Sequence, residues 1–404
     1  MSVLLVQWLR TAFFLGLSIF CLTPAARLAA DAPSAPEAGK AGPEGGLMAI
    51  FKQGTVEEMR QALNLGADLN QPDESDGLTP LMAAAGFNKN FDAVEFLISQ
   101  GARLDAQDKM FGLTPLMFAV NFNTPAALEV FFKAGADLDQ RDFNGGTAMH
   151  HAAVLKNPAA LLLLGKAGAK VDARDKNGLT PLMQAASLSG LQAVVTILKL
   201  GAKINEKNDA GQTALMLAAG NNQNVEVIER LIQDGADLEA RDQTGLTPFL
   251  AAAAGNVNVE ILRFLKRAGA DVKAVDGAGA DALLLAALSN GNPEAAKYVL
   301  NETGADINAR RANGLTPILA AAANANPEVT RALIIAGADL SAKDAQGRNA
   351  LMLAAWLNPN AEVAKLMVSG GLNPYEQDNQ GRCALDYAGD SRSDLVDFFL
   401  KNKE

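Results

Sequence analysis

A glycine recurs about every 34 residues over most of the chain. Ten such positions span 304 residues in nine steps, which gives this repeat length. They are Gly77, Gly112, Gly145, Gly178, Gly211, Gly245, Gly279, Gly314, Gly347 and Gly381. Periods of about 20 to 50 residues are typical of repeat arrays, in which each unit packs mainly on its neighbours. The period therefore predicts one repeat array in place of two or three unrelated globular domains.

The segment from Asp175 to Asn205 shows how one unit should fold. Thr180 can cap a helix N-terminus with its hydroxyl, and Pro181 suits the first helical position, where its missing N–H loses nothing. Gly190 interrupts the chain, and Gly201 suits the left-handed residue that ends a second, apolar helix. Short helices of this kind are unstable alone in water, so neighbouring units should stack. We expect an all-α solenoid of helix-loop-helix units.

The two ends of the array should differ from its interior because each end lacks one neighbour. We assign an N-terminal capping repeat to residues 47–76, where Thr55 and Glu58 have capping-box spacing. Nine repeats follow at 77–380, and a C-terminal capping repeat with a polar end occupies 381–404.

These units resemble the ankyrin repeat family over residues 47–404. The T-P-L-H signature of that family is represented by T-P-L-M or a close variant that starts at Thr79, Thr114, Thr180 and Thr247. The G-A-D signature starts at Gly66, Gly135, Gly235, Gly269, Gly304 and Gly337. The resemblance implies an ankyrin-repeat solenoid with projecting turns, or fingers, capped at both ends. It also implies a non-catalytic protein that binds other proteins.

The chain departs from the family pattern in three ways. Methionine or leucine usually replaces the signature histidine, so only Thr147 and His150 can form the family's threonine–histidine hydrogen bond. The loops between the paired helices are rich in asparagine. The unit at Gly279 has Asp281 and Ala282 in place of threonine and proline, so we expect a weak unit with the fastest hydrogen exchange, caps aside, near residues 276–290.

The N-terminus has the features of an export signal. Arg10 is followed by an apolar stretch, and small residues that end at Ala30 provide a cleavage site. We therefore assign a signal peptide to residues 1–30 and a disordered Ala/Pro/Gly tether to residues 31–46. The predicted location is periplasmic or secreted, and the alternative is a membrane anchor formed by an uncleaved N-terminal segment.

Composition argues against several classes of function. The net charge of −10 disfavours nucleic acid and anionic membranes as partners. Two histidines and two cysteines leave little for metal clusters or histidine-based catalysis, so we expect no cofactor, no metal site and no enzyme. Asp142 and Asp175 lie in turns that resemble calcium loops, but turn chemistry explains them. Cys383 occupies a cap position, where we expect a small buried residue.

The resemblance places partner binding on the fingers and on a concave face beside the inner helices. The candidate finger residues are Phe111 and Phe143, and the candidate inner-helix residues are Phe87, Phe122, Leu155, Leu188, Trp356 and Leu357. The leucines after the turn glycines are better explained by packing, whereas packing and binding remain equally open for the four phenylalanines. If the phenylalanines bind a partner, each should expose its ring and contribute little to folding.

The sequence therefore predicts a monomeric protein–protein interaction scaffold exported to the periplasm. The alternative is a secreted inhibitor or effector that acts on a protein of another cell. A soluble enzyme is a distant third interpretation.

Overall fold

The computed structural model describes residues 46–401 except 75, 123–124, 189, 312 and 390–391. The predicted signal peptide and residues 31–45 of the predicted tether lie outside the described residues. Within the described part the regular structure is helical, with no strand. The described residues form two compact units: unit 1 comprises those up to 185 and 192–203, and unit 2 comprises 186–191 and those from 204 onward.

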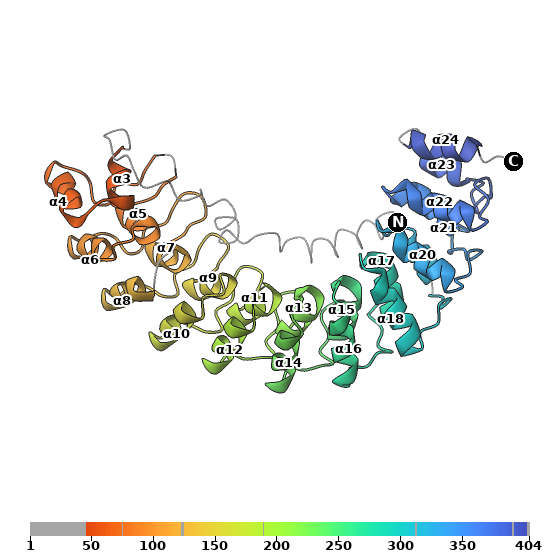
Figure 1. Ribbon diagram of the computed structural model, residues 1–404, viewed down its shortest axis with the longest axis horizontal. Helices are drawn as coiled ribbons and strands as arrows, with labels where there is room; N and C mark the ends of the chain where they lie inside the picture. Colours follow the sequence, from red (N-terminus) through yellow and green to blue (C-terminus); the bar gives the residue numbers. More distant parts are fainter. Residues whose placement is uncertain are drawn as a thin grey trace. The chain divides into compact units, whose positions relative to one another are not determined.

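Unit 1 is a series of helix pairs (Figure 1). The first helices of the pairs, which we call inner helices, contact one another in chain order, and so do the second, outer helices. The pairs are α3 (Gly46–Gln53) with α4 (Val56–Asn64), α5 (Pro80–Phe87) with α6 (Asp92–Ser99), α7 (Pro115–Phe122) with α8 (Pro125–Lys133), and α9 (Ala148–Val154) with α10 (Pro158–Lys166). The next pair, α11 (Pro181–Leu188) and α12 (Leu191–Lys199), contains residues of both units.

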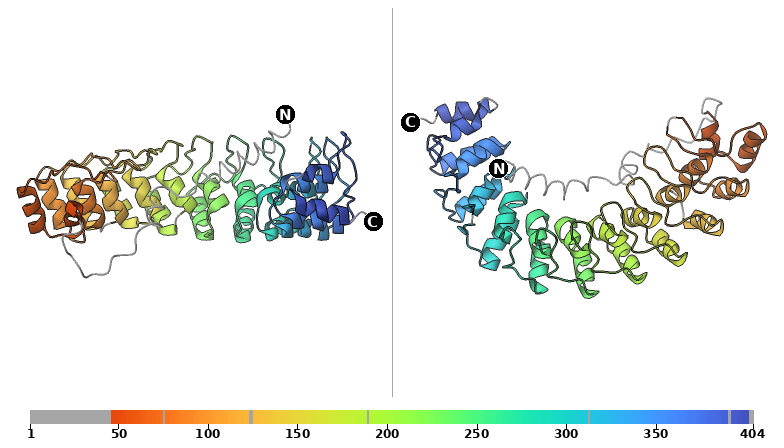
Figure 2. Two further views of the ribbon diagram at one scale, coloured as in Figure 1. Left: turned by 90° about the horizontal axis from the view of Figure 1, so that it is seen from above. Right: turned by 180° about the vertical axis from the view of Figure 1, so that it is seen from behind.

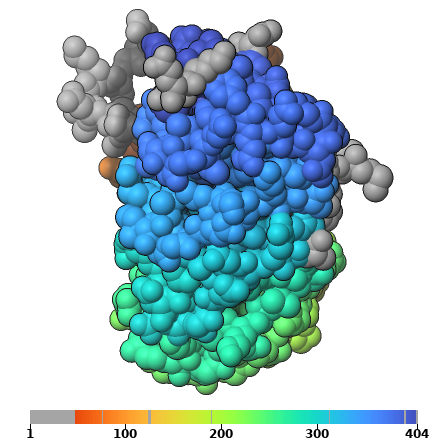
Figure 3. Space-filling view, turned by 90° about the vertical axis from the view of Figure 1, so that its right-hand side faces the viewer, coloured from red at the N-terminus to blue at the C-terminus, as the bar shows by residue number. Residues whose placement is uncertain are grey.

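Unit 2 repeats the same arrangement to the end of the described chain. Its pairs are α13 (Ala214–Asn221) with α14 (Val225–Gln233), α15 (Pro248–Gly255) with α16 (Val259–Arg267), α17 (Ala282–Ser289) with α18 (Pro293–Thr303), α19 (Pro317–Ala321) with α20 (Pro327–Ile335), α21 (Ala350–Leu357) with α22 (Ala361–Ser369), and α23 (Ala384–Ala388) with α24 (Ser393–Lys401). Figure 3 shows its later repeats as layers that follow one another in sequence order.

The inner helices begin at the expected caps. Thr79 Oγ1 accepts a hydrogen bond of 3.3 Å from Met82 N–H. Thr147 Oγ1 lies 3.0 Å from His150 Nδ1, which confirms the predicted family contact. In most other repeats a methionine takes the histidine's position, and the Sδ of Met82 accepts weakly from Thr79 N–H at 3.4 Å.

Helix α17 is capped although its unit lacks the threonine and proline of the other repeats. Asp281 Oδ1 accepts a hydrogen bond of 2.9 Å from Leu284 N–H, so aspartate caps this helix in place of threonine. Aspartate is among the strongest N-cap residues. Its negative charge also suits the positive end of the helix dipole.

The fingers are tight turns held by their own aspartates. Asp142 Oδ1 accepts from Asn144 N–H at 2.8 Å and from Gly146 N–H at 2.7 Å, which confirms the turn interpretation of this residue. Adjacent fingers are joined by backbone hydrogen bonds, for example from Gly277 N–H to Thr244 O at 2.8 Å. Figure 2 shows the turns of each unit projecting beyond its helices.

Buried asparagines connect the repeats of unit 2 in a row that we call the asparagine ladder. Its members are Asn222, Asn256, Asn290, Asn324 and Asn358, spaced 34 residues apart. Each is at most 7% exposed, and each side-chain amide donates to a carbonyl in, or at the C-cap of, the inner helix of the preceding repeat. From Asn256 onward the amide also donates to the main-chain oxygen of the preceding ladder residue. At the end of the ladder, Arg392 donates to Asn358 O in place of another asparagine.

The core is built from alanine, leucine, valine and methionine of both helices, with a few large rings. Phe51 and Phe131 in unit 1 and Phe249 and Phe399 in unit 2 are fully buried. Leu78, Leu113 and Leu179 are also buried, which confirms that these leucines pack between repeats, whereas Leu246 and Leu315 are half-buried. Among the described helices, none is both long and apolar enough to span a membrane.

Candidate binding surface

Two of the predicted phenylalanines form a stacked pair in unit 1. Phe87 ends α5 and Phe122 ends α7, so they occupy equivalent positions in consecutive repeats. Their ring centroids are 5.5 Å apart with an interplanar angle of 26°. Phe87 is 41% exposed, and Lys52 Nζ lies 5.5 Å from its ring centroid. We call Phe87 and Phe122 the helix-end pair.

Phe122 is less exposed than expected. Its ring is half-buried between Phe87 and Phe118, whose centroid is 6.1 Å away. Gly86 makes this arrangement possible, because a Cβ there would approach Phe118 Cδ1 to 3.1 Å. The expectation that these rings contribute little to folding is therefore wrong for Phe122, since stacked aromatic pairs contribute about 0.5 to 1.5 kcal/mol beyond their burial.

The finger residues form a second pair in the same unit. Phe143 N–H donates to Phe111 O at 2.9 Å, and the Phe143 ring packs on Gly112, where a Cβ would overlap it. Phe111 is half-buried, whereas Phe143 is 49% exposed. Met110 beside them is 63% exposed and was not among the predicted site residues. The sequence signal that could have identified Met110 is its position next to Phe111 in the finger.

The remaining predicted residues belong to other helix pairs. Leu155 follows α9 in unit 1 and is half-buried, and Leu188 at the end of α11 belongs to unit 2. Trp356 and Leu357 end α21 in unit 2 and are half-buried. The Trp356 ring lies between the guanidinium of Arg348, at 5.3 Å, and the ring of Tyr387, at 5.9 Å. Trp356 therefore packs against its own repeat and the last one.

The adjacent histidines of α9 are both engaged in structural contacts. His150 Nε2 lies 3.0 Å from Leu179 O in the next repeat, and burial lowers the pKa of His150 to about 4. His151 Nε2 lies 2.9 Å from Asp142 Oδ2, with both side chains at most 4% exposed. Burial alone would raise the pKa of Asp142, but hydrogen bonding and charge from His151 and the N–H groups of its turn outweigh burial and lower it. These contacts fasten the finger to α9.

No group of three or more metal-binding side chains gathers among the described residues. Cys383, at the start of α23, is a free thiol. It is half-buried, so the expectation of a buried residue is wrong.

Comparisons with known proteins define the family. The family model for ankyrin repeats (3 copies) matches in eight overlapping segments, from 84–175 through to 318–404. This chain therefore belongs to the ankyrin repeat family. A search of curated proteins returned no match.

Among 566 matching chains of solved structures is the ankyrin repeat domain of Bcl-3, described as a unique member of the IκB protein family. It is 29% identical, with a TM-score of 0.46, over 52% of this chain and 95% of the Bcl-3 chain. The repeats of this chain indicate a scaffold for protein–protein interaction, and ankyrin repeat scaffolds are typically non-enzymatic.

Proposed function

We propose that this protein is an exported, non-catalytic scaffold that binds a partner protein through the helix-end pair of unit 1. The observation that carries the proposal is the Phe87 ring, which is 41% exposed yet held by Phe122 on α7. Lys52 adds a cation at 5.5 Å from the same ring. An exposed aromatic ring that is already fixed loses little conformational freedom on binding, so more of its burial contributes to affinity.

The finger pair supports the same proposal from a second position in unit 1. Phe143 and Met110 expose apolar surface at turns whose backbone is fixed by hydrogen bonds. Exposed apolar groups on rigid elements are suited to anchoring a partner. The helix-end pair remains the primary anchor because its two rings contact each other.

Export is proposed from the residues that precede the described part of the chain. The charged and apolar segments before Ala30 and the small residues around it favour cleavage and release into the periplasm. N-terminal sequencing should show that the mature protein begins shortly after Ala30. Recovery of intact Met1 in the membrane fraction would instead support the anchored form. Fractionation separates a periplasmic scaffold from a secreted effector, which would reach the medium.

The binding proposal is tested by partner capture from periplasmic extract. The double variant Phe87→Ala, Phe122→Ala should capture the partner of the wild-type protein at least tenfold more weakly, because truncation of a central anchor costs about 2 kcal/mol or more. The matched control is Phe264→Ala, which removes a half-buried ring from outer helix α16 of unit 2 and should not alter capture.

Circular dichroism must accompany the capture experiment because the helix-end pair also stabilises the fold. We expect the double variant to remain folded with a loss of about 2 to 3 kcal/mol, from ring stacking and from the partial burial of the two rings. Undiminished capture by the folded double variant would refute the proposed surface. Equal loss of capture in the Phe264→Ala control would refute it as well.

A further inference from the structure

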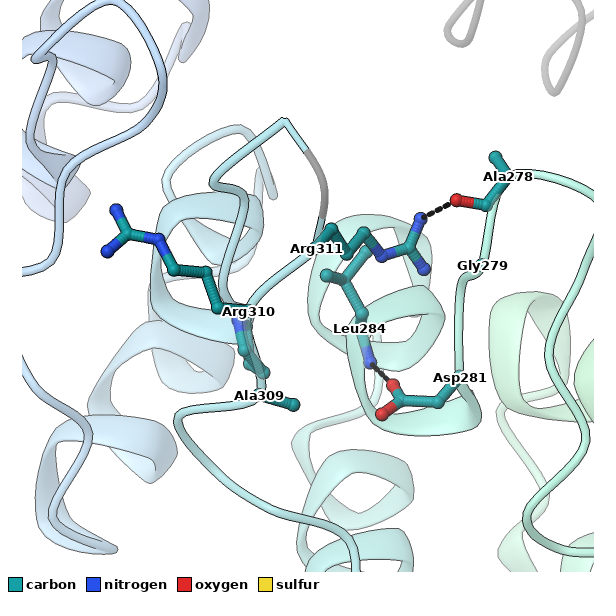
Figure 4. A pocket seen from close by; sticks show the side chains of 8 residues that line it. Ala278, Gly279, Asp281, Leu284, Ala309, Arg310 and Arg311 are labelled. Atoms are coloured by element: carbon teal, nitrogen blue, oxygen red, sulfur yellow. Dashed lines mark hydrogen bonds between the residues drawn. The ribbon is translucent and has the colours of Figure 1, made fainter.

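A pocket of about 230 Å³ opens in unit 2 between the finger at Gly279 and the segment that leads into α19. Figure 4 shows Arg311 and Asp281 on its walls, with Arg310 directed away from them. Leu284 and Pro317 provide apolar wall. The pocket lies in a different unit from the helix-end pair, so it is a separate site.

Two departures from the repeat pattern meet at this pocket. Asp281 stands at the helix-cap position, which is a threonine at Thr79, Thr114, Thr147, Thr180, Thr213, Thr247 and Thr316. Arg311 stands at the turn position, which is an acid or its amide at Asp142, Asp175, Asn208, Asp242, Asp276 and Asp344. One repeat therefore has an additional acidic residue, Asp281, and the next has the basic Arg311 where an acidic residue is usual. The two residues lie on facing walls of the pocket.

The space exists because the fingers do not close over it. In the neighbouring repeats the next finger packs on the turn glycine: a Cβ on Gly245 would lie 2.6 Å from Gly277 N, and one on Gly314 would lie 2.9 Å from Ala345 N. A Cβ on Gly279 would meet nothing within 4 Å. The finger at 277–280 has no side chain larger than a methyl group to fill the gap.

The guanidinium of Arg311 has unused hydrogen-bonding capacity. Its Nη1 reaches Ala278 O only at 3.5 Å, and its Nη2 is buried without a hydrogen-bond partner. A buried donor without a partner is destabilising, more so if charged, so a ligand that accepts from it gains affinity. Burial lowers the pKa of Arg311, whereas the charges of Asp276 and Asp281 act in the opposite direction. The group remains a cation at neutral pH, as arginine does in proteins.

Asp281 presents the complementary group. Its Oδ1 caps α17 through Leu284 N–H, which leaves Oδ2 to accept from a ligand. Asp281 lies near enough to influence the charge on Arg311, yet these two described residues form no ion pair. A donor and an acceptor therefore line the same pocket without satisfying each other.

We propose that this pocket binds an amide group, whose carbonyl oxygen accepts from Arg311 Nη2 and whose N–H donates to Asp281. A carboxylate would be repelled by Asp281 and Asp276, and a cation would be repelled by Arg311. A neutral group that both accepts and donates satisfies both walls without adding charge. The source is either the primary carboxamide of an asparagine or glutamine side chain or a peptide bond of an extended partner.

The test uses methyl NMR of Leu284, which lines the pocket, in the full chain. The probes are N-acetylglutamine methylamide, the corresponding glutamate derivative and the corresponding alanine derivative, which has peptide bonds alone. We expect saturable shifts of the Leu284 methyl signals with the glutamine probe. Stronger binding of the glutamine probe than of the alanine probe assigns the side-chain carboxamide, and equal binding of these two assigns the peptide bond.

The double variant Asp281→Thr, Arg311→Asp tests the two polar walls. It has the residues that other repeats carry at these positions, so it should fold. It should raise the dissociation constant of the amide probe at least tenfold. Asp281→Asn, which keeps a capping side chain but removes the charge, should weaken binding in the same direction. Tighter binding of the glutamate probe, no saturable shift with any probe, or unchanged binding by folded variants would each overturn the proposal. None of these outcomes depends on whether Phe87 binds a partner.

Discussion

Replacing one asparagine of the ladder should damage the array far more than replacing an asparagine two residues away. Asn290 is fully buried, and its amide donates at 2.9 Å to Ala253 O and at 2.9 Å to Asn256 O. Ala253 lies in the last turn of α15, where helix carbonyls lack an intrahelical partner. Asn290→Leu therefore leaves two buried carbonyls unsatisfied and excludes water from them. At about 1 to 3 kcal/mol for each group, we expect a loss of about 3 kcal/mol.

The matched control is Asn292→Ala. Asn292 caps α18 through Glu294 N–H at 3.0 Å and donates to Val257 O at 2.6 Å, but these bonds are exposed. Water can replace them, so the control should lose only about 1 kcal/mol. Urea unfolding followed by circular dichroism measures both variants, with amide hydrogen exchange to locate the weakened repeats. Equal stability of the two variants would refute the assigned role of the ladder.

Two further predictions concern His150 and the end of the ladder. The pKa of His150 is about 4 in the folded protein and about 6.5 when unfolded, so the unfolded state binds the extra proton between these values. This histidine should therefore cost about 3 kcal/mol of stability as the pH falls from 7 to 4. His150→Leu copies Leu250 of another repeat. It should remove most of this loss of stability between pH 7 and pH 4, as measured by urea unfolding at each pH. An unchanged pH dependence of stability would contradict the assignment. Arg392→Ala should speed hydrogen exchange in α23 and α24 because Asn358 O loses its partner, whereas unchanged exchange there would contradict this role.

The repetitive part of the fold could be predicted from sequence because each feature depends on residues close together in the chain. The turn glycines, the threonine caps and the contact of Thr147 with His150 all act within one unit. Their chemistry is local, so spacing alone identifies it. The repeat length then predicts that neighbouring units stack.

Contacts between repeats were harder to predict. The asparagines at Asn256 and Asn290 were visible in sequence as an Asn-rich loop, but their partners are main-chain atoms 34 to 37 residues earlier. Arg392 lies 34 residues after Asn358, but its role could be recognised only from the structure, where it donates to Asn358 O at the end of the ladder. The exposure of Phe122 was misjudged because it depends on Phe87 and Phe118, which approach it from two repeats.

The most direct test of the binding surface is site-specific photo-crosslinking in the producing cells. A photoreactive phenylalanine analogue replaces Phe87 in one strain and Ile335 in another. Ile335 is 79% exposed at the end of outer helix α20 and serves as the control. We predict that position 87 crosslinks to a discrete partner protein and that position 335 does not. Crosslinking of the same partner at position 335 but not at position 87 would contradict the proposed surface.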